Sequence, residues 1–192
     1  MSTTDLMKTG ASKLERSPGE AEAAFAAAAK ENPTDLQALL SLGAAQLKQQ
    51  KLTEATQSFE RAVKADATSV VAGVLHALSL ENDRQYEKAI EAWTRVATLD
   101  PTSMDAQEHL AALGDLTRQS QVSLGARQAL AALRPGNPAV LSDLGVYLSR
   151  AGKHADAVRA FERAQLLEPG FVERHAAELA AYTASREATR KR

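Results

Sequence analysis

The hydrophobic positions of this chain recur three and four residues apart, and no stretch shows the strict alternation of a β-strand. Within the helical pattern, one large aromatic residue returns at intervals of 34 residues, with one point vacant: Phe25, Phe59, Trp93 and Phe161. Four positions before each ring stands an alanine, and a further series keeps another site small: Gly43, Ala77, Ala111 and Gly145. Small residues let two helices approach closely and one ring fills the space between them, so the pattern predicts repeated pairs of packed helices.

A second set of positions with the same interval marks where helices begin. Four of the six prolines lie on it, and Ala67 occupies the vacant point: Pro33, Pro101, Pro135 and Pro169. Two residues after each point comes a side chain that favours the N-cap position: Asp35, Ser69, Ser103 and Asn137. The sequence therefore predicts helix starts near residues 36, 70, 104 and 138.

The segment 138–171 resembles the tetratricopeptide repeat, because it carries that family's pattern at Leu141, Leu144-Gly145, Leu148, Ala157, Phe161 and Pro169. The resemblance implies an all-α fold, a right-handed solenoid of about five helical hairpins plus a C-terminal capping helix. We expect a single domain over 1–192. Its units are 2–35, whose first half is degenerate, 36–69, 70–103, a degenerate 104–137, and 138–171. A capping helix and a basic tail follow at 172–192.

Two units depart from the family pattern. In the unit 104–137, Gly114, Ser123 and Arg127 stand where the family prefers a large apolar, a small and an aromatic residue. We therefore expect the second helix of that unit to be shifted or loosely seated. In the unit 70–103, His76 replaces a usual leucine.

Composition narrows the possible functions. The chain has 192 residues, 44% of them hydrophobic, and a formal net charge of -1, so it can bury a core and lacks the basic surplus of a nucleic-acid-binding protein. It has no cysteine, which excludes disulfides and thiolate chemistry. No signal peptide or run of about 18 apolar residues is present, so we expect a soluble, cytoplasmic protein that does not insert into membranes.

The sequence offers no candidate for catalysis. The four histidines, His76, His109, His154 and His175, do not share a helix face at metal-ligand spacing, and neither a phosphate-binding glycine loop nor a nucleophile elbow occurs. We expect no metal, no cofactor and no catalytic residue. The chain is interpreted as non-enzymatic.

In proteins that it resembles, the first helix of each hairpin lines an inner groove that holds a partner protein. The matching positions here are Leu40, Ala44, Val71, Val74, Leu78, Asp105, Glu108, Ala112, Ser142, Asp143 and Val146. They predict a partner segment, extended or helical, that is apolar toward the N-terminal half and basic toward the C-terminal half. Three alternatives stay open: that these residues are merely packed or solvated, that the chain is a self-assembling scaffold, or that it is a dedicated assembly or secretion chaperone.

Some members of the family hold the acidic C-termini of chaperones with a clamp of Lys, Asn and Arg. The matching positions here are Leu40, Ala44, Leu75, Asp105 and His109, and neither of the neighbouring registers provides a basic clamp. An anionic chaperone tail is therefore disfavoured as a ligand of the inner groove.

Overall fold

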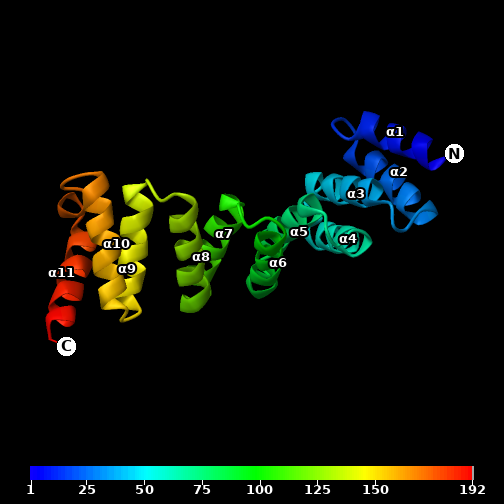
Figure 1. Cartoon of the computed structure of the whole chain (residues 1–192). Coiled ribbons are helices and arrows are strands. Elements are labelled where there is room, and N and C mark those ends of the chain that lie inside the picture. The colour runs from blue at the N-terminus through cyan, green and yellow to red at the C-terminus, as the bar shows by residue number, and fades with distance from the viewer. Residues whose placement is uncertain (192) are drawn as a thin grey trace. The chain divides into compact units, whose positions relative to one another are not determined.

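The computed structural model describes residues 1–191, and over them the chain is all-helical (Figure 1). Eleven α-helices and one short 3-10 helix occur among these residues. They are α1 (Thr3–Lys13), α2 (Pro18–Glu31), α3 (Leu36–Lys48), α4 (Leu52–Ala65), α5 (Val70–Asn82), α6 (Tyr86–Leu99), α7 (Met104–Leu116), α8 (Ser120–Leu133), α9 (Pro138–Arg150), α10 (His154–Leu167), η1 (Val172–Arg174) and α11 (Ala176–Arg190). The predicted all-α class is confirmed.

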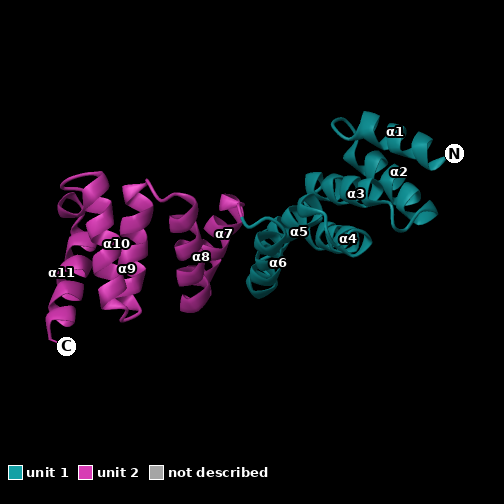
Figure 2. Ribbon diagram, in the orientation of Figure 1, with its two compact units in different colours: residues 1–101 teal, residues 102–192 magenta. Residues whose placement is uncertain are grey.

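The helices form two compact units, coloured separately in Figure 2. Unit 1 (Met1–Pro101) stacks the hairpins α1–α2, α3–α4 and α5–α6, with α2 packed on α3 and α4 packed on α5. Unit 2 (Thr102–Arg192) contains the hairpins α7–α8 and α9–α10, with α8 packed on α9 and with α11 packed on both helices of the last hairpin. Each unit is therefore a stack of helical hairpins, as the 34-residue interval predicts.

The predicted N-caps are confirmed. The side chain of Asp35 accepts a hydrogen bond from the backbone N–H of Ala38 at 3.0 Å, and Ser69 does the same for Ala72 at 3.2 Å. Ser103 and Asn137 cap α7 and α9 in the same way. Each bond satisfies a backbone N–H that has no partner inside its own helix, which fixes the start of the first helix in four successive hairpins.

The aromatic series forms the centre of the hairpins. Phe25, Phe59, Trp93 and Phe161 are at most 2% exposed. A Cβ placed on Gly43 would lie 2.6 Å from the ring of Phe59, and one on Gly145 would lie 2.8 Å from the ring of Phe161. These glycines are small because a ring of the paired helix occupies the space that a side chain would need.

The first hairpin is more complete than its sequence indicates. Helix α1 begins with a capping box between Ser2 and Asp5, and its Gly10 contacts the ring of Phe25 so closely that a Cβ would lie 2.5 Å away. Gly10 fills the role of Gly43, but it stands 33 residues before Gly43 and not 34. The degenerate appearance of this half-repeat comes from that one-residue offset.

The segment predicted as a single capping helix consists of two helical pieces. The 3-10 helix η1 is followed by His175 in an extended conformation, with φ -121° and ψ 106°, before α11 begins. The break places the buried Val172 against the last hairpin and lets Tyr182 of α11 pack on Phe161, with ring centroids 5.6 Å apart. The residues after the break therefore cover the ring that ends the aromatic series.

The second helix of the unit 104–137, which we expected to be shifted or loosely seated, keeps the sequence register of the repeat. Helix α8 begins 34 residues after α6 and 34 before α10, as a regular repeat requires. A Cβ on Gly114 would lie 2.6 Å from the backbone nitrogen of Ser123, so the glycine allows α7 and α8 to approach at backbone distance. Gly114 thus compensates for the missing large side chain by bringing the two helices together.

Candidate functional site

The first helices of unit 1 present an apolar face. Leu40 and Ala44 of α3 are half-buried, as are Val74 and Leu78 of α5, and Val71 is 60% exposed. Helix α5 carries no charged residue before Glu81. A helix that is apolar around its circumference normally has every face covered. On α5, however, the stripe formed by Val71, Val74 and Leu78 is not fully covered within unit 1.

The first helix of unit 2 presents a hollow with acidic walls. Asp105, Glu108 and Ala112, three of the predicted groove residues, line it together with His109, and it encloses about 230 Å³. Glu108 forms an ion pair of 3.2 Å with Arg134, the residue that directly follows α8, whereas Asp105 is exposed to solvent. Part of the negative charge predicted for this face is therefore balanced within the unit.

The remaining predicted residues lie on α9 and do not form a surface together. Ser142 and Val146 are buried in unit 2, and the Ser142 hydroxyl has no hydrogen-bond partner among the described residues. Asp143 is exposed, and its carboxylate accepts a hydrogen bond from Arg127 at 2.8 Å. Of the three α9 positions, only Asp143 can meet a partner.

Arg127 is the centre of a polar network that replaces the ring missing from the aromatic series. Its side chain is only 11% exposed, and it donates to Asp115 of α7, to Asp143 of α9 and to the hydroxyl of Ser123, at 2.7 to 2.8 Å. The guanidinium carbon lies 3.5 Å from the centroid of the Tyr147 ring. Arg127 thus joins α7, α8 and α9 through a planar fork that matches carboxylates and stacks on an aromatic face.

Asp115 completes the network from the other side. Its carboxylate accepts from Ser123 at 2.5 Å and from the Tyr147 hydroxyl at 2.7 Å, as well as from Arg127. Burial raises the pKa of this carboxyl, but these hydrogen bonds and the Arg127 charge outweigh burial and hold the pKa below its ordinary value. Burial and the bond to Asp115 raise the pKa of Tyr147. At neutral pH the carboxylate is charged and the phenol is a donor.

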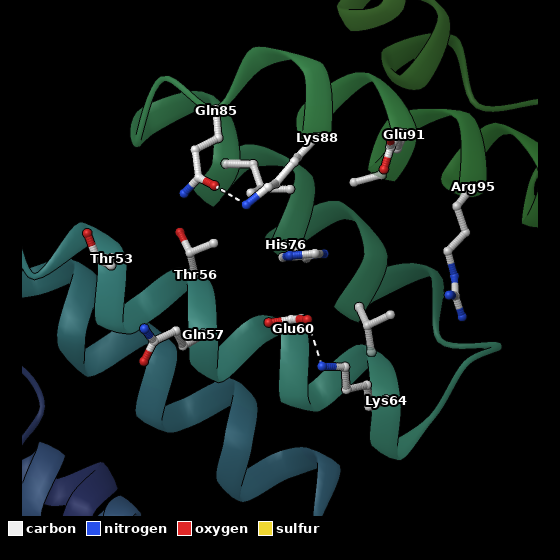
Figure 3. Close-up of a pocket in the computed structure, with 13 residues that line it drawn as sticks. Thr53, Thr56, Gln57, Glu60, Lys64, His76, Gln85, Lys88, Glu91 and Arg95 are labelled. Carbon is white, nitrogen blue, oxygen red and sulfur yellow. Dashed lines mark hydrogen bonds and ion pairs between the residues drawn. The ribbon is translucent and has the colours of Figure 1, made fainter.

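A separate groove opens between the second helices of unit 1, over helix α5 (Figure 3). It encloses about 700 Å³, with one wall from α4, the other from α6 and the turn before it, and His76 and Leu80 of α5 between them. Figure 3 shows the His76 ring between Glu60 of α4 and Lys88 of α6. Burial lowers the pKa of His76, and the neighbouring Glu60 opposes this effect.

Unit 2 contains the repeat-equivalent groove, of about 630 Å³, between α8 and α10 over α9. Two repeats separate the two grooves, so Leu144 takes the place of His76, Asp156 that of Lys88, and Arg163 that of Arg95. The groove of unit 2 has an apolar floor, including Leu141 and Leu148, where that of unit 1 carries a histidine. The two grooves share a fold position and differ in chemistry.

Within the part of the chain that the structure describes, no group of three or more histidine and carboxylate side chains is arranged to hold a metal ion. No helix there combines the length and the apolar character needed to cross a bilayer.

The Arg127 network and the His76 groove were missed by the reasoning from sequence. Both stand at positions that the sequence marks as departures, but the departures in the unit 104–137 were interpreted as a sign of loose packing. The signal available was that Gly114, Ser123 and Arg127 depart together in one hairpin, as compensating changes do.

Comparison with known proteins supports the repeat assignment. Residues 13–70 match the model of a tetratricopeptide-repeat family. The chain is 26% identical, over 204 aligned residues, to a peroxisomal targeting signal receptor from Eremothecium gossypii. That alignment covers 88% of this chain and 36% of the receptor, so the chain spans about a third of the length of its curated relative.

Solved structures match the fold over most of the chain. The crystal structure of MamA protein superposes with a TM-score of 0.66 at 22% identity, covering 90% of this chain and 95% of that one. A MamA structure from Desulfovibrio magneticus gives 0.61 at 21% identity, covering 88% and 96%. At these identities the likeness shows the fold. Residues 13–70 therefore match the tetratricopeptide repeat, and the 34-residue interval and the solved structures show that the same hairpin fold continues over most of the chain.

Proposed function

We propose that this chain is a non-enzymatic protein-interaction module, and that the first helices of its hairpins bind a segment of a partner protein. The observation that carries the proposal is the stripe of Val71, Val74 and Leu78 on α5, which unit 1 leaves incompletely covered. Apolar surface that unit 1 leaves exposed can contribute binding free energy, because a partner that covers this surface removes it from water.

The acidic hollow of unit 2 favours a basic segment in a partner that binds there. Asp105 is exposed on the wall of the hollow, and the Arg134 partner of Glu108 is itself about one-third exposed. Exposed carboxylates contribute to the rate of encounter and to discrimination between partners more than to affinity. A partner segment that fits unit 1 is apolar where it meets α3 and α5, and a segment that fits unit 2 carries Lys or Arg where it meets α7.

The curated relative supports the general class. It is named as a receptor for a peroxisomal targeting signal, and a receptor of that kind binds protein. Because this chain spans only 36% of that receptor, the relative supports a protein-binding role here without specifying the partner.

The test is affinity capture of partners by the tagged chain from native extract, followed by mass spectrometry. Val71→Asp places a charge on the apolar stripe of α5, and Asp105→Lys reverses the charge of the α7 hollow. The matched controls are Ala26→Asp on α2 and Glu162→Lys on α10, which make the same kinds of change at exposed positions of second helices.

We expect the parent and both controls to capture the same partner, and the two first-helix variants to lose most of it while keeping the parental melting temperature. If folded Val71→Asp and Asp105→Lys retain the partner as the controls do, the first-helix face is not the binding surface. Recovery of further copies of this chain alone would favour the self-assembling scaffold instead.

A further inference from the structure

We propose that the groove between α4 and α6 is a second binding site, and that it takes an acidic peptide segment of a partner protein. The site lies between two second helices of unit 1, with His76 and Leu80 of α5 between its walls, and it includes none of the residues of the first-helix face. Its cationic side chains come from both walls, with His76 between them (Figure 3): Lys64 of α4, and Lys88 and Arg95 of α6.

The charges of the groove do not cancel within unit 1. Lys64 donates to Glu60 at 2.7 Å, so that pair is internally balanced. Lys88 donates to the neutral amide oxygen of Gln85 at 2.8 Å, and Arg95 donates to the backbone carbonyl of Ala67 at 2.5 Å. Both cations are therefore held in place by neutral acceptors, which position the charge without neutralising it.

Glu91 lies on the wall between the two cations, so α6 contributes two positive charges and one negative charge to the groove. The surplus is positive at neutral pH, and it increases when His76 takes up a proton. A ligand with carboxylates therefore complements the groove, and a cationic ligand is repelled by it.

The spacing of the cations sets the spacing of the ligand's acids. Lys88 and Arg95 are seven residues apart on one helix, which corresponds to roughly 10 Å along the axis. An extended chain advances about 3.3 Å per residue, so that distance spans about three residues of a bound peptide. The segment that fits carries two acidic side chains about three positions apart.

His76 makes the site sensitive to pH. In the free protein, burial lowers its pKa, Glu60 raises it, and the charges of Lys64, Arg95 and Lys88 lower it further. A carboxylate bound in the groove stabilises the imidazolium and raises this pKa. Binding therefore takes up a proton, and affinity increases as pH falls through the window between the free and bound pKa values.

The repeat-equivalent groove of unit 2 indicates that the fold itself does not require these residues. There Leu144 and Asp156 occupy the positions of His76 and Lys88, and the hairpins pack with the same helix bounds. The basic surplus of the unit 1 groove thus has no structural role that the repeat needs. The unit 2 groove also supplies Arg163 as a matched control position for Arg95.

The probe is a fluorescein-labelled nonapeptide of alanine and serine with two glutamates three positions apart, and its partner is the same peptide with glutamines. Binding to the whole chain is followed by fluorescence anisotropy at low salt. We expect the glutamate peptide to bind, Lys88→Gln and Arg95→Gln each to weaken it at least about threefold, and Glu91→Gln to strengthen it. Arg163→Gln, the same change at the equivalent position of unit 2, should leave the affinity unchanged.

The pH arm uses His76→Leu, which installs the residue found at position 144. The parent should bind the glutamate peptide more tightly at pH 5.5 than at pH 7.5, and the variant should lose that difference. Equal binding of the glutamate and glutamine peptides, or equal weakening by Arg95→Gln and Arg163→Gln, would overturn the proposal. Displacement of the peptide by equimolar sulfate would reduce the site to a general anion contact, and would equally overturn it.

Failure here leaves the proposed function standing, because none of these substitutions touches the first-helix face. Conversely, Val71→Asp and Asp105→Lys change that face and should leave binding of the glutamate peptide unaltered. The two proposals are therefore tested separately.

Discussion

Replacement of Arg127 by methionine tests whether a polar network stabilises the fourth hairpin, α7–α8, in place of a ring. The substitution keeps an unbranched, helix-compatible side chain and removes the guanidinium. The lost contacts are two carboxylate bonds, the bond to the Ser123 hydroxyl and the stacking on Tyr147.

The magnitude follows from the exposure of the partners. The side chains of Asp115 and Asp143 are 37% and 52% exposed, so each ion pair is worth no more than about 1 kcal/mol. The bond to the buried Ser123 adds about 1 kcal/mol, and the stacking on Tyr147 adds about 0.5 to 1 kcal/mol. We expect Arg127→Met to lower the free energy of unfolding by about 2 to 4 kcal/mol.

The assay is urea unfolding followed by circular dichroism at 222 nm, combined with amide exchange resolved for α7, α8 and α9. Arg163→Met, at an exposed position of α10, is the control and should change stability by less than about 0.5 kcal/mol. Arg127→Lys, which keeps the charge without the fork, should fall between parent and methionine variant. A methionine variant as stable as the control would refute the reasoning, because the network would then contribute nothing.

Three further predictions concern packing, turns and pH. Phe59→Ala should lower the free energy of unfolding by about 3 to 5 kcal/mol, since Phe59 is completely buried against Gly43; an unchanged denaturation curve would reject the hairpin register. Within the turns of the later hairpins, Arg84 has a φ of 56° and Gly152, at the equivalent position, a φ of 72°. Arg84→Gly should therefore raise the free energy of unfolding and Gly152→Ala should lower it, each by up to about 1 kcal/mol. Melting-temperature shifts of the same sign in the two variants would contradict this. Because burial lowers the pKa of His76, the folded state binds fewer protons there than the unfolded state. The stability that depends on neutral His76 is present above the pKa of this residue in the unfolded state, and it is lost as pH falls toward its pKa in the folded state. Acid should therefore destabilise His76→Leu less than the parent, as measured by Trp93 fluorescence.

Helix positions were predictable from the sequence because their determinants are local. An N-cap such as Ser69 acts on the backbone three residues away, and a ring such as Phe59 returns at a fixed interval with its small partner, Gly43. Gly10 escaped the same reasoning because a one-residue offset removes it from the interval while leaving its contact with Phe25 intact. Local signals therefore specify the helices, and the contact itself is visible only in three dimensions.

Side-chain partnerships were not predictable in the same way. Asp115, Arg127 and Tyr147 come from three different helices, and nothing in their spacing distinguishes a network from three solvated side chains. The acidic surface was overestimated for the same reason, because Asp143 is paired with Arg127 of α8 and Glu108 with Arg134 directly after it. Charges on a helix face can be counted from the sequence, whereas their neutralisation depends on which neighbouring helix packs beside them.

The most direct test of the interaction-module account is amide exchange of the chain with and without its captured partner. The first helices α3, α5 and α7 contain the residues that we place against the partner segment, so their amides should exchange more slowly in the complex, with the largest change near Val71 and Asp105. Protection confined to other helices, with α5 and α7 unchanged in a saturated complex, would contradict the account.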